Sequence, residues 1–411
     1  MSGRQGRQAG IAFVLVVLFL DILGIGIVIP VLPGLVADFV GGDASAAAPY
    51  YAALASVYAA MQFLFSPLIG ALSDRFGRRI VLLVALTGFA ISYLILALAP
   101  SLVWLFVGRV LAGITGATIT TVNAYIADVS TPATRARNFG FVGVAFGLGF
   151  IFGPAIGGVL GGFGLRVPFL GSAAVAVIGV IYGAFVLPES LPAERRRPFA
   201  WNRIDPLRAL GGLRTYPIVA GLAGAFVFFS LAQRGLETVF VLYTDYRYAW
   251  GPTENGLALA LVGVMAAVVQ GALVRPMVAR VGERRTIQIG LSVAMVGFLL
   301  YALAVEGWML LAALVVGSLG GVSGPALQGL VAGSVPPEEQ GSVQGALTSI
   351  LSLTAIAAPL LAGGLFSAFT GPEAPLEVPG MPFLVGSALF AVALVLVGIT
   401  LRRYPSTDTT A

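Results

Sequence analysis

Ten residues, GALSDRFGRR at positions 70–79, join two long apolar segments and place one carboxylate and three arginines in a short turn. A related stretch, RPMVARVGERR at positions 275–285, follows about half the 411-residue chain later. At this one offset Arg75, Gly77 and Arg79 reappear as Arg280, Gly282 and Arg284, and Gly116 and Pro154 reappear as Gly321 and Pro359. The repeat predicts two structurally related halves that run in parallel.

The composition indicates a protein that lies within a membrane. Hydrophobic residues make up 58% of the chain, charged residues 10%, and the mean hydropathy is +0.97, whereas about 25% of residues are charged in soluble proteins. Segments of the ~20 residues needed to cross a bilayer occur at 10–33, 50–72, 79–99, 101–126, 138–162, 167–187, 216–243, 254–275, 286–305, 308–332, 341–368 and 382–401. The expected fold is all-α, with 12 transmembrane helices in two six-helix bundles.

Several kinds of chemistry are excluded by missing residue types. The chain has no cysteine and no histidine, which removes disulfides, thiolate nucleophiles, Ser-His catalysis and histidine metal sites. We find no nucleophile–base pair and no aspartate cluster, so neither an intramembrane enzyme nor a metal or cofactor site is expected. The basic residues form short clusters between apolar runs, which argues against a nucleic-acid surface.

The arginines predict the orientation in the membrane. With a cytoplasmic N-terminus, all but four of the 23 basic residues fall on the inner side, as the positive-inside rule requires. The exceptions are Arg166 and Arg247 in outer loops and Arg109 and Arg234 within spans. Both termini are therefore expected in the cytoplasm, with bundles at 1–187 and 215–411 joined by a cytoplasmic linker at 188–214.

Two opposite charges lie at equal depth in this arrangement. Asp21 in the first span and Arg109 in the fourth would sit ~16 and ~18 Å above the cytoplasmic edge, at 1.5 Å per helical residue. Charges at such depth are costly and are candidates for function. Two interpretations are open: a permanent brace between the helices, or a carboxylate whose protonation follows a conformational cycle. Glu237, three residues after Arg234, is either a locally neutralised group or a second proton site.

Polar side chains in four spans are candidates for ligand contacts. Arg109, Gly113, Gly116, Thr120 and Asn123 recur at helical spacing on one face of the fourth span. Asn123 maps to Gln328 at the repeat offset, so two amides could face a ligand from the two halves; the alternative is interhelical hydrogen bonding. The remaining candidates are Tyr58, Gln62 and Gln233.

Two further motifs concern helix packing. In the fifth span Gly149, Gly153, Gly157 and Gly161 recur every four residues and form a smooth ridge for close approach of another backbone. Pro154 favours a kink in this span, and Gly158 belongs to the same motif. Packing against the other half to prevent leakage and plain helix packing both fit this ridge. The loop residues Gly70, Asp74, Arg75, Arg78 and Arg79 form a candidate conformational latch, with Asp128 as partner of one arginine. Ala279 stands where the second copy would carry Asp74, so this latch is asymmetric.

These motifs resemble a known family. DILGIGIVIPVLPGL at 21–35, the loop at 70–79, RVLAGITGA at 109–117, AYIADVS at 124–130 and GPAIGG at 153–158 are similar to motifs of the drug:proton antiporters of the major facilitator superfamily, in particular its tetracycline-resistance branch. The resemblance implies that Arg109 tunes proton exchange, that the segment at 153–158 blocks leakage, and that Asp74 and Asp128 stabilise an outward-facing state. Ser92 and Ala294 stand where that branch carries acidic residues, which counts against metal-chelated tetracycline as the substrate.

The predicted function is secondary active transport. A carrier that exports lipophilic or amphipathic molecules in exchange for protons would use Asp21, and Glu237 as a second group, to bind the proton. The alternatives are a symporter or exporter of a small polar metabolite, and a passive channel or receptor. The expected partners are a small-molecule substrate, protons and the lipid bilayer, for a monomer in the inner membrane of a bacterium or archaeon that needs no cofactor beyond the proton gradient.

Overall fold

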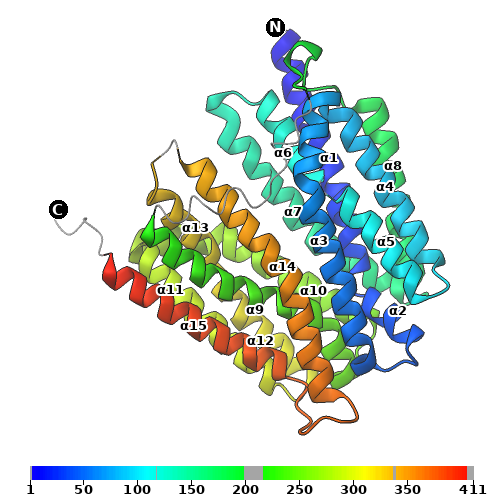
Figure 1. Ribbon diagram of the computed structural model, residues 1–411, viewed down its shortest axis with the longest axis vertical. Coiled ribbons are helices and arrows are strands. Elements are labelled where there is room, and N and C mark those ends of the chain that lie inside the picture. The colour runs from blue at the N-terminus through cyan, green and yellow to red at the C-terminus, as the bar shows by residue number, and fades with distance from the viewer. Residues whose placement is uncertain (1, 117, 199–215, 337–338, 405–411) are drawn as a thin grey trace. The chain divides into compact units, whose positions relative to one another are not determined.

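A computed structural model describes residues 2–116, 118–198, 216–336 and 339–404, and every regular element in these ranges is a helix (Figure 1). The first half contains α1 (Ser2–Val28), α2 (Leu32–Phe39), α3 (Ala44–Phe76), α4 (Arg78–Leu98), α5 (Leu102–Thr115), α6 (Thr118–Val129), α7 (Pro132–Gly161), α8 (Val167–Val186) and the short η1 (Ala193–Arg195). The second half contains α9 (Pro217–Tyr248), α10 (Pro252–Val268), η4 (Val269–Leu273), α11 (Val274–Leu303), α12 (Gly307–Leu319), η5 (Gly320–Val322), α13 (Ser323–Gly333), α14 (Gln340–Thr370) and α15 (Met381–Arg403).

The described residues contain 11 helical stretches that are long and apolar enough to cross a membrane. One of them, Pro252–Leu303, is 52 residues long and holds two of the predicted spans. Gly282 interrupts it with a φ of 79° and a ψ of 163°, which no helix contains. The predicted spans at 254–275 and 286–305 are therefore separated by a turn at Gly282, within what is otherwise continuous helical hydrogen bonding.

The sequence repeat is visible in the backbone. Gly77, between α3 and α4, has a φ of 104°, and its counterpart Gly282 also lies in the left-handed region that favours glycine. The predicted fourth and tenth spans are each interrupted at the matching place. In the fourth span the α-helix ends at Thr115, and Gly116 is its C-cap residue. In the tenth span the 3₁₀ turn η5 interrupts the α-helix at Gly320–Val322. The two copies of the loop motif therefore turn at matching glycines, and the fourth and tenth spans are interrupted at matching positions.

The chain divides into two compact units. One comprises Met1–Pro206 with Trp250–Gly263, and the other comprises Leu207–Ala249 with Val264–Ala411. In the first unit α1 packs against α7 and α8, and α4 packs against α5 and α8; in the second, α9 packs against α14 and α15, and α11 against α15. The first half of α10 thus joins the unit that contains α7.

Apolar side chains fill the interior of each unit and also cover its outside. Leu18 and Ile22 of α1 are buried with Tyr125 of α6, and Phe298 of α11 makes ring contacts with Phe383 and Phe390 of α15. Many other large apolar side chains are exposed, as expected of helices whose outer surfaces contact lipid rather than water.

Candidate functional site

Asp21 is buried within the first unit, with 6% of its surface exposed. Its side chain forms a hydrogen bond with Thr118, the first residue of α6. The hydroxyl of Tyr93 on α4 lies within electrostatic range of both Asp21 and Arg109. Helices α1, α4, α5 and α6 therefore each contribute one polar group to a single cluster, which we call the Asp21 cluster: Asp21, Tyr93, Arg109 and Thr118.

Within this cluster Arg109 forms no ion pair with Asp21 among the described residues. The guanidinium carbon of Arg109 instead lies 5.6 Å from the ring centroid of Tyr58 on α3, close enough for a cation–π interaction. Its Nε is buried without a hydrogen-bond partner among the described residues. Among the described residues the guanidinium of Arg109 therefore contacts Tyr58 and forms no ion pair with Asp21.

The second and fourth spans are held together beside this cluster. The side-chain amide of Gln62 donates a hydrogen bond to the carbonyl of Gly116 at 2.9 Å, which satisfies a carbonyl at the end of α5. A Cβ on Gly113 would lie only 2.6 Å from the carbonyl oxygen of Tyr58. Gln62 and Tyr58 thus meet the small-residue face of α5, while Asn123 is half-buried further along the chain in α6.

Ser92 and Ala294 stand at the positions where the resemblance implies acidic residues, and both are buried. Ser92 is fully buried and donates its hydroxyl hydrogen bond to the carbonyl of Phe89 at 2.8 Å. Ala294 is buried against Gly320, where an added Cβ would lie 2.7 Å from the backbone nitrogen of Ala294. Both positions are therefore buried among helices of their own units.

Arg78 is the centre of the loop motif at 70–79. Its guanidinium lies 2.6 Å from Asp74 and 3.1 Å from Asp128, and it donates a hydrogen bond to Ser73 at 2.5 Å. This arginine is buried, with 7% exposed. The other residues of the predicted latch lie around it: Arg79 donates to the carbonyl of Ala184, Gly70 faces Thr120, and the exposed Arg75 lies over the ring of Phe76.

Glu189 is part of this loop structure and was missed by the sequence reasoning. Its carboxylate accepts hydrogen bonds from the backbone N–H groups of Arg78 at 2.9 Å and Arg79 at 3.3 Å, at the start of α4. It also accepts from the N–H groups of Ser190 and Leu191, each at 3.0 Å. A carboxylate is favourable at a helix N-terminus. Glu189 lies in a segment that we interpreted only as a charged linker, and no local spacing links it to α4.

The second copy of the loop is built differently. Arg284, the counterpart of Arg79, donates hydrogen bonds to the carbonyls of Leu401 at 3.3 Å and Tyr404 at 2.8 Å. It therefore satisfies carbonyls at the end of α15, where cations are favourable. The asymmetry expected from Ala279 thus coincides with a different local role for the arginines.

The glycine ridge of α7 has two contact faces. Added Cβ atoms on Gly149 and Gly153 would lie 2.6 Å from the Ile22 side chain and 2.7 Å from Gly26 Cα, both on α1. Gly157 is equally tight against Ile27. A Cβ on Gly158 would instead lie 2.7 Å from the carbonyl oxygen of Pro252, in the first turn of α10. Pro154, inside α7, contributes to both faces through contacts with Gly26 and Gly256.

The remaining candidates lie in the second unit. Arg234 and Glu237 form an ion pair of 2.8 Å on α9 with about half of each side chain exposed. Gln233 beside them is half-buried, and Gln328 is exposed on α13. Within the described residues there is no cluster of three or more acidic, histidine or cysteine side chains that could hold a metal ion.

Comparison with known proteins identifies the family of this helical membrane protein. Residues 14–277 and 238–411 match the model of the Major Facilitator Superfamily. The chain belongs to this superfamily. The class C tetracycline resistance protein of Escherichia coli is 39% identical over 375 residues, which cover 91% of this chain and 93% of that protein. The class G protein of Vibrio anguillarum is 37% identical over 388 residues, which cover 92% and 95%.

A solved structure agrees on the fold. The crystal structure of a bacterial homologue of the human lysosomal transporter Spinster, inward-facing and occupied, aligns with a TM-score of 0.80 over 96% of each chain at 16% identity. At this identity the likeness concerns the fold alone. This member of the Major Facilitator Superfamily is therefore an all-α membrane transporter and not an enzyme.

Proposed function

We propose that this transporter exports lipophilic or amphipathic drugs from the cytoplasm of a bacterium in exchange for protons, by alternating access. The similarity to tetracycline resistance proteins over more than nine-tenths of the chain supports export of drugs. The two pseudo-symmetric bundles would rock around a central substrate path, with both termini in the cytoplasm, as the distribution of arginines favours. The protein would act as a monomer.

Asp21 is the proposed proton carrier. The single observation that carries this proposal is a buried carboxylate that has a hydroxyl neighbour, Thr118, but no ion-pair partner among the described residues. Burial without a counter-charge favours the neutral form of a carboxyl group, whereas access to water or the approach of a guanidinium favours the ionised form. A rearrangement that brings Arg109 from Tyr58 towards Asp21 would therefore release the proton.

The substrate class follows from the residues that could contact it. Tyr58, Gln62 and Asn123 in the first unit, with Gln233 and Gln328 in the second, offer aromatic and uncharged hydrogen-bonding groups. Such groups suit an amphipathic molecule better than a strongly charged metabolite. Tetracycline is the first compound to test, with and without magnesium, since Ser92 and Ala294 leave out two carboxylates that a metal chelate would favour.

The test compares two aspartate variants in proteoliposomes. Asp21→Asn removes the proposed proton site, and Asp38→Asn makes the same chemical change at an exposed residue near the end of α2. We expect Asp21→Asn to lose uptake driven by a pH gradient while it retains counterflow of labelled substrate, because binding and rocking do not need the proton. Asp38→Asn should behave as the unaltered protein. Full gradient-driven transport by Asp21→Asn would refute the role of Asp21.

A further inference from the structure

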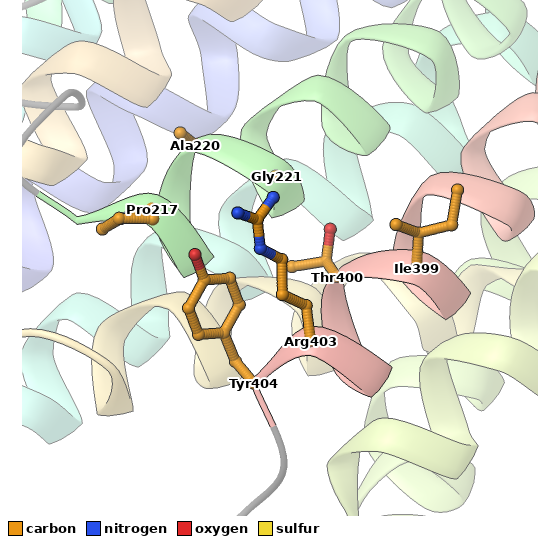
Figure 2. A pocket seen from close by; sticks show the side chains of 7 residues that line it. All are labelled: Pro217, Ala220, Gly221, Ile399, Thr400, Arg403 and Tyr404. Atoms are coloured by element: carbon orange, nitrogen blue, oxygen red, sulfur yellow. The ribbon is translucent and has the colours of Figure 1, made fainter.

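A surface pocket of about 500 Å³ opens in the second unit where α9 begins and α15 ends (Figure 2). Its walls are Pro217, Ala220 and Gly221 of α9 and Ile399, Thr400, Arg403 and Tyr404 at the end of α15. None of these residues belongs to the proposed drug or proton path. Among these lining residues none is a carboxylate, and Arg403 carries a positive charge.

Three polar side chains are directed to the same side of the pocket. Figure 2 shows the Arg403 guanidinium and the hydroxyls of Thr400 and Tyr404 turned towards the first turns of α9. Thr400 is 7% exposed, and its hydroxyl has no hydrogen-bond partner among the described residues. Thr400 lines the pocket, and a ligand oxygen there would accept a hydrogen bond from its hydroxyl. Gly221 provides the space, because a Cβ there would collide with Thr400.

The start of α9 adds a favourable field for an anion. α9 is 32 residues long and begins at Pro217, which lines the pocket. The first N–H groups of a helix lack intrahelical partners, and the helix dipole favours negative charge there. Arg284 holds the carbonyl of Tyr404 at 2.8 Å, so the end of α15 that carries Arg403 is held in position against α11.

An apolar stripe leads away from the pocket along α15. Val392, Val395 and Ile399 are 41%, 59% and 58% exposed, and they precede Arg403 at three- and four-residue spacing on one helix face. In a membrane this stripe contacts acyl chains. A molecule that lies along it would bring its head group to Arg403, Thr400 and Tyr404. The combination of an anion site with a lipid-facing stripe fits an amphiphile better than a free ion.

The geometry points to a binding site for an anionic phospholipid of the cytoplasmic leaflet, with its phosphate between Arg403, Thr400 and the start of α9 and one acyl chain along the stripe on α15. The leaflet follows from the proposed orientation of the chain, in which the end of α15 is cytoplasmic. The lipid would tie together the first and last helices of the second unit, which pack against each other.

The experiment measures the thermal unfolding midpoint of the delipidated, full-length protein in a neutral detergent, followed by tryptophan fluorescence. The protein is titrated with dioctanoyl phosphatidylglycerol, with dioctanoyl phosphatidylcholine, which has the same chains and a zwitterionic head group, and with inorganic phosphate. We expect a saturable rise of the midpoint with phosphatidylglycerol alone. An equal rise of the midpoint with inorganic phosphate would show that the pocket binds a free anion and not a lipid. An equal rise with phosphatidylcholine would show that the charge of the head group does not contribute to binding. Either result would overturn the proposal.

A pair of neighbouring arginine variants separates a site from general attraction to the surface. Arg402 is exposed beside Arg403 but does not line the pocket. We expect Arg403→Gln to weaken the apparent affinity for phosphatidylglycerol about fivefold, the effect of one arginine near an anionic lipid surface, and Arg402→Gln to change it less than twofold. Equal losses in the two variants would overturn the proposal.

Thr400→Val provides a second and independent variant. It keeps the shape of the side chain, so it tests the hydroxyl even if Arg403→Gln folds poorly. We expect a loss of affinity of about fivefold or more, because a phosphate oxygen in the pocket would then lack a hydrogen bond of about 1 kcal/mol or more. Unchanged affinity in Thr400→Val would place the lipid elsewhere. Gradient-driven drug transport, measured on the same variants, is not needed for this result, so the lipid site and the transport function can fail separately.

Discussion

Gly153→Ala tests how tightly α1 and α7 are packed. The added Cβ would lie 2.7 Å from Gly26 Cα and 3.0 Å from Gly26 carbonyl carbon. These are backbone atoms of α1 that cannot rotate away, so the two helices would have to separate by about 1 Å to restore ordinary contact distances in a close-packed interior. Overpacking of this kind costs about 1–3 kcal/mol.

The matched control is Gly147→Ala on the same helix. A Cβ on Gly147 meets nothing within 4 Å. Both variants replace glycine by alanine inside α7, so the gain in helix propensity, up to about 1 kcal/mol, is common to them. The difference between the variants therefore isolates the contact with Gly26. We expect Gly147→Ala to be neutral or slightly stabilising and Gly153→Ala to be less stable than Gly147→Ala by about 1–3 kcal/mol.

The assay is unfolding in mixed micelles with increasing SDS, followed by the fluorescence of the four tryptophans. The absence of cysteine means that no thiol-reactive dye can be used. Drug transport in proteoliposomes is measured in parallel, because a separation of α1 from α7 also displaces Asp21 on α1. If the two variants unfold at the same SDS fraction, the close approach of α1 and α7 is wrong.

Three further predictions concern polar contacts. Arg78→Gln breaks two ion pairs of 2.6 and 3.1 Å that a buried guanidinium makes with two partly exposed carboxylates. It should lower the transport rate at least tenfold, because it removes the charged hydrogen bonds that link α3 to α6 at the loop motif, whereas Arg75→Gln at an exposed position should change the rate less than twofold. Ser230 and Thr354 share a buried hydrogen bond of 2.8 Å. A double-mutant cycle with alanine at both positions should give a coupling free energy of unfolding of about 0.6 kcal/mol. Additive effects of the two substitutions would contradict this hydrogen bond. Arg166→Gln removes two hydrogen bonds to backbone carbonyls, of 2.7 and 2.8 Å, and should lower the unfolding free energy by about 1–3 kcal/mol; an unchanged midpoint in SDS would show that water replaces them.

Length, hydropathy and the repeat were enough to predict the helices and their turns. Gly77 and Gly282 occupy matching positions of the repeat, and both have a positive φ, which glycine adopts without strain. The sequence also predicted that Asp21 and Arg109 lie within long apolar helices, and the structure places them inside α1 and α5. These features depend on local backbone preference and on the burial of long apolar segments, which are properties of consecutive residues.

The tertiary structure decided which side chains meet. The sequence predicted equal depth for Asp21 and Arg109, but the described residues show no ion pair between them, and Arg109 lies over Tyr58 instead. Glu189 reaches the start of α4 from more than a hundred residues away, and the ridge of α7 presents Gly153 to α1 but Gly158 to α10. Helix rotation and long-range approach are set by the packing of all neighbouring helices together, so no periodicity within one segment specifies them.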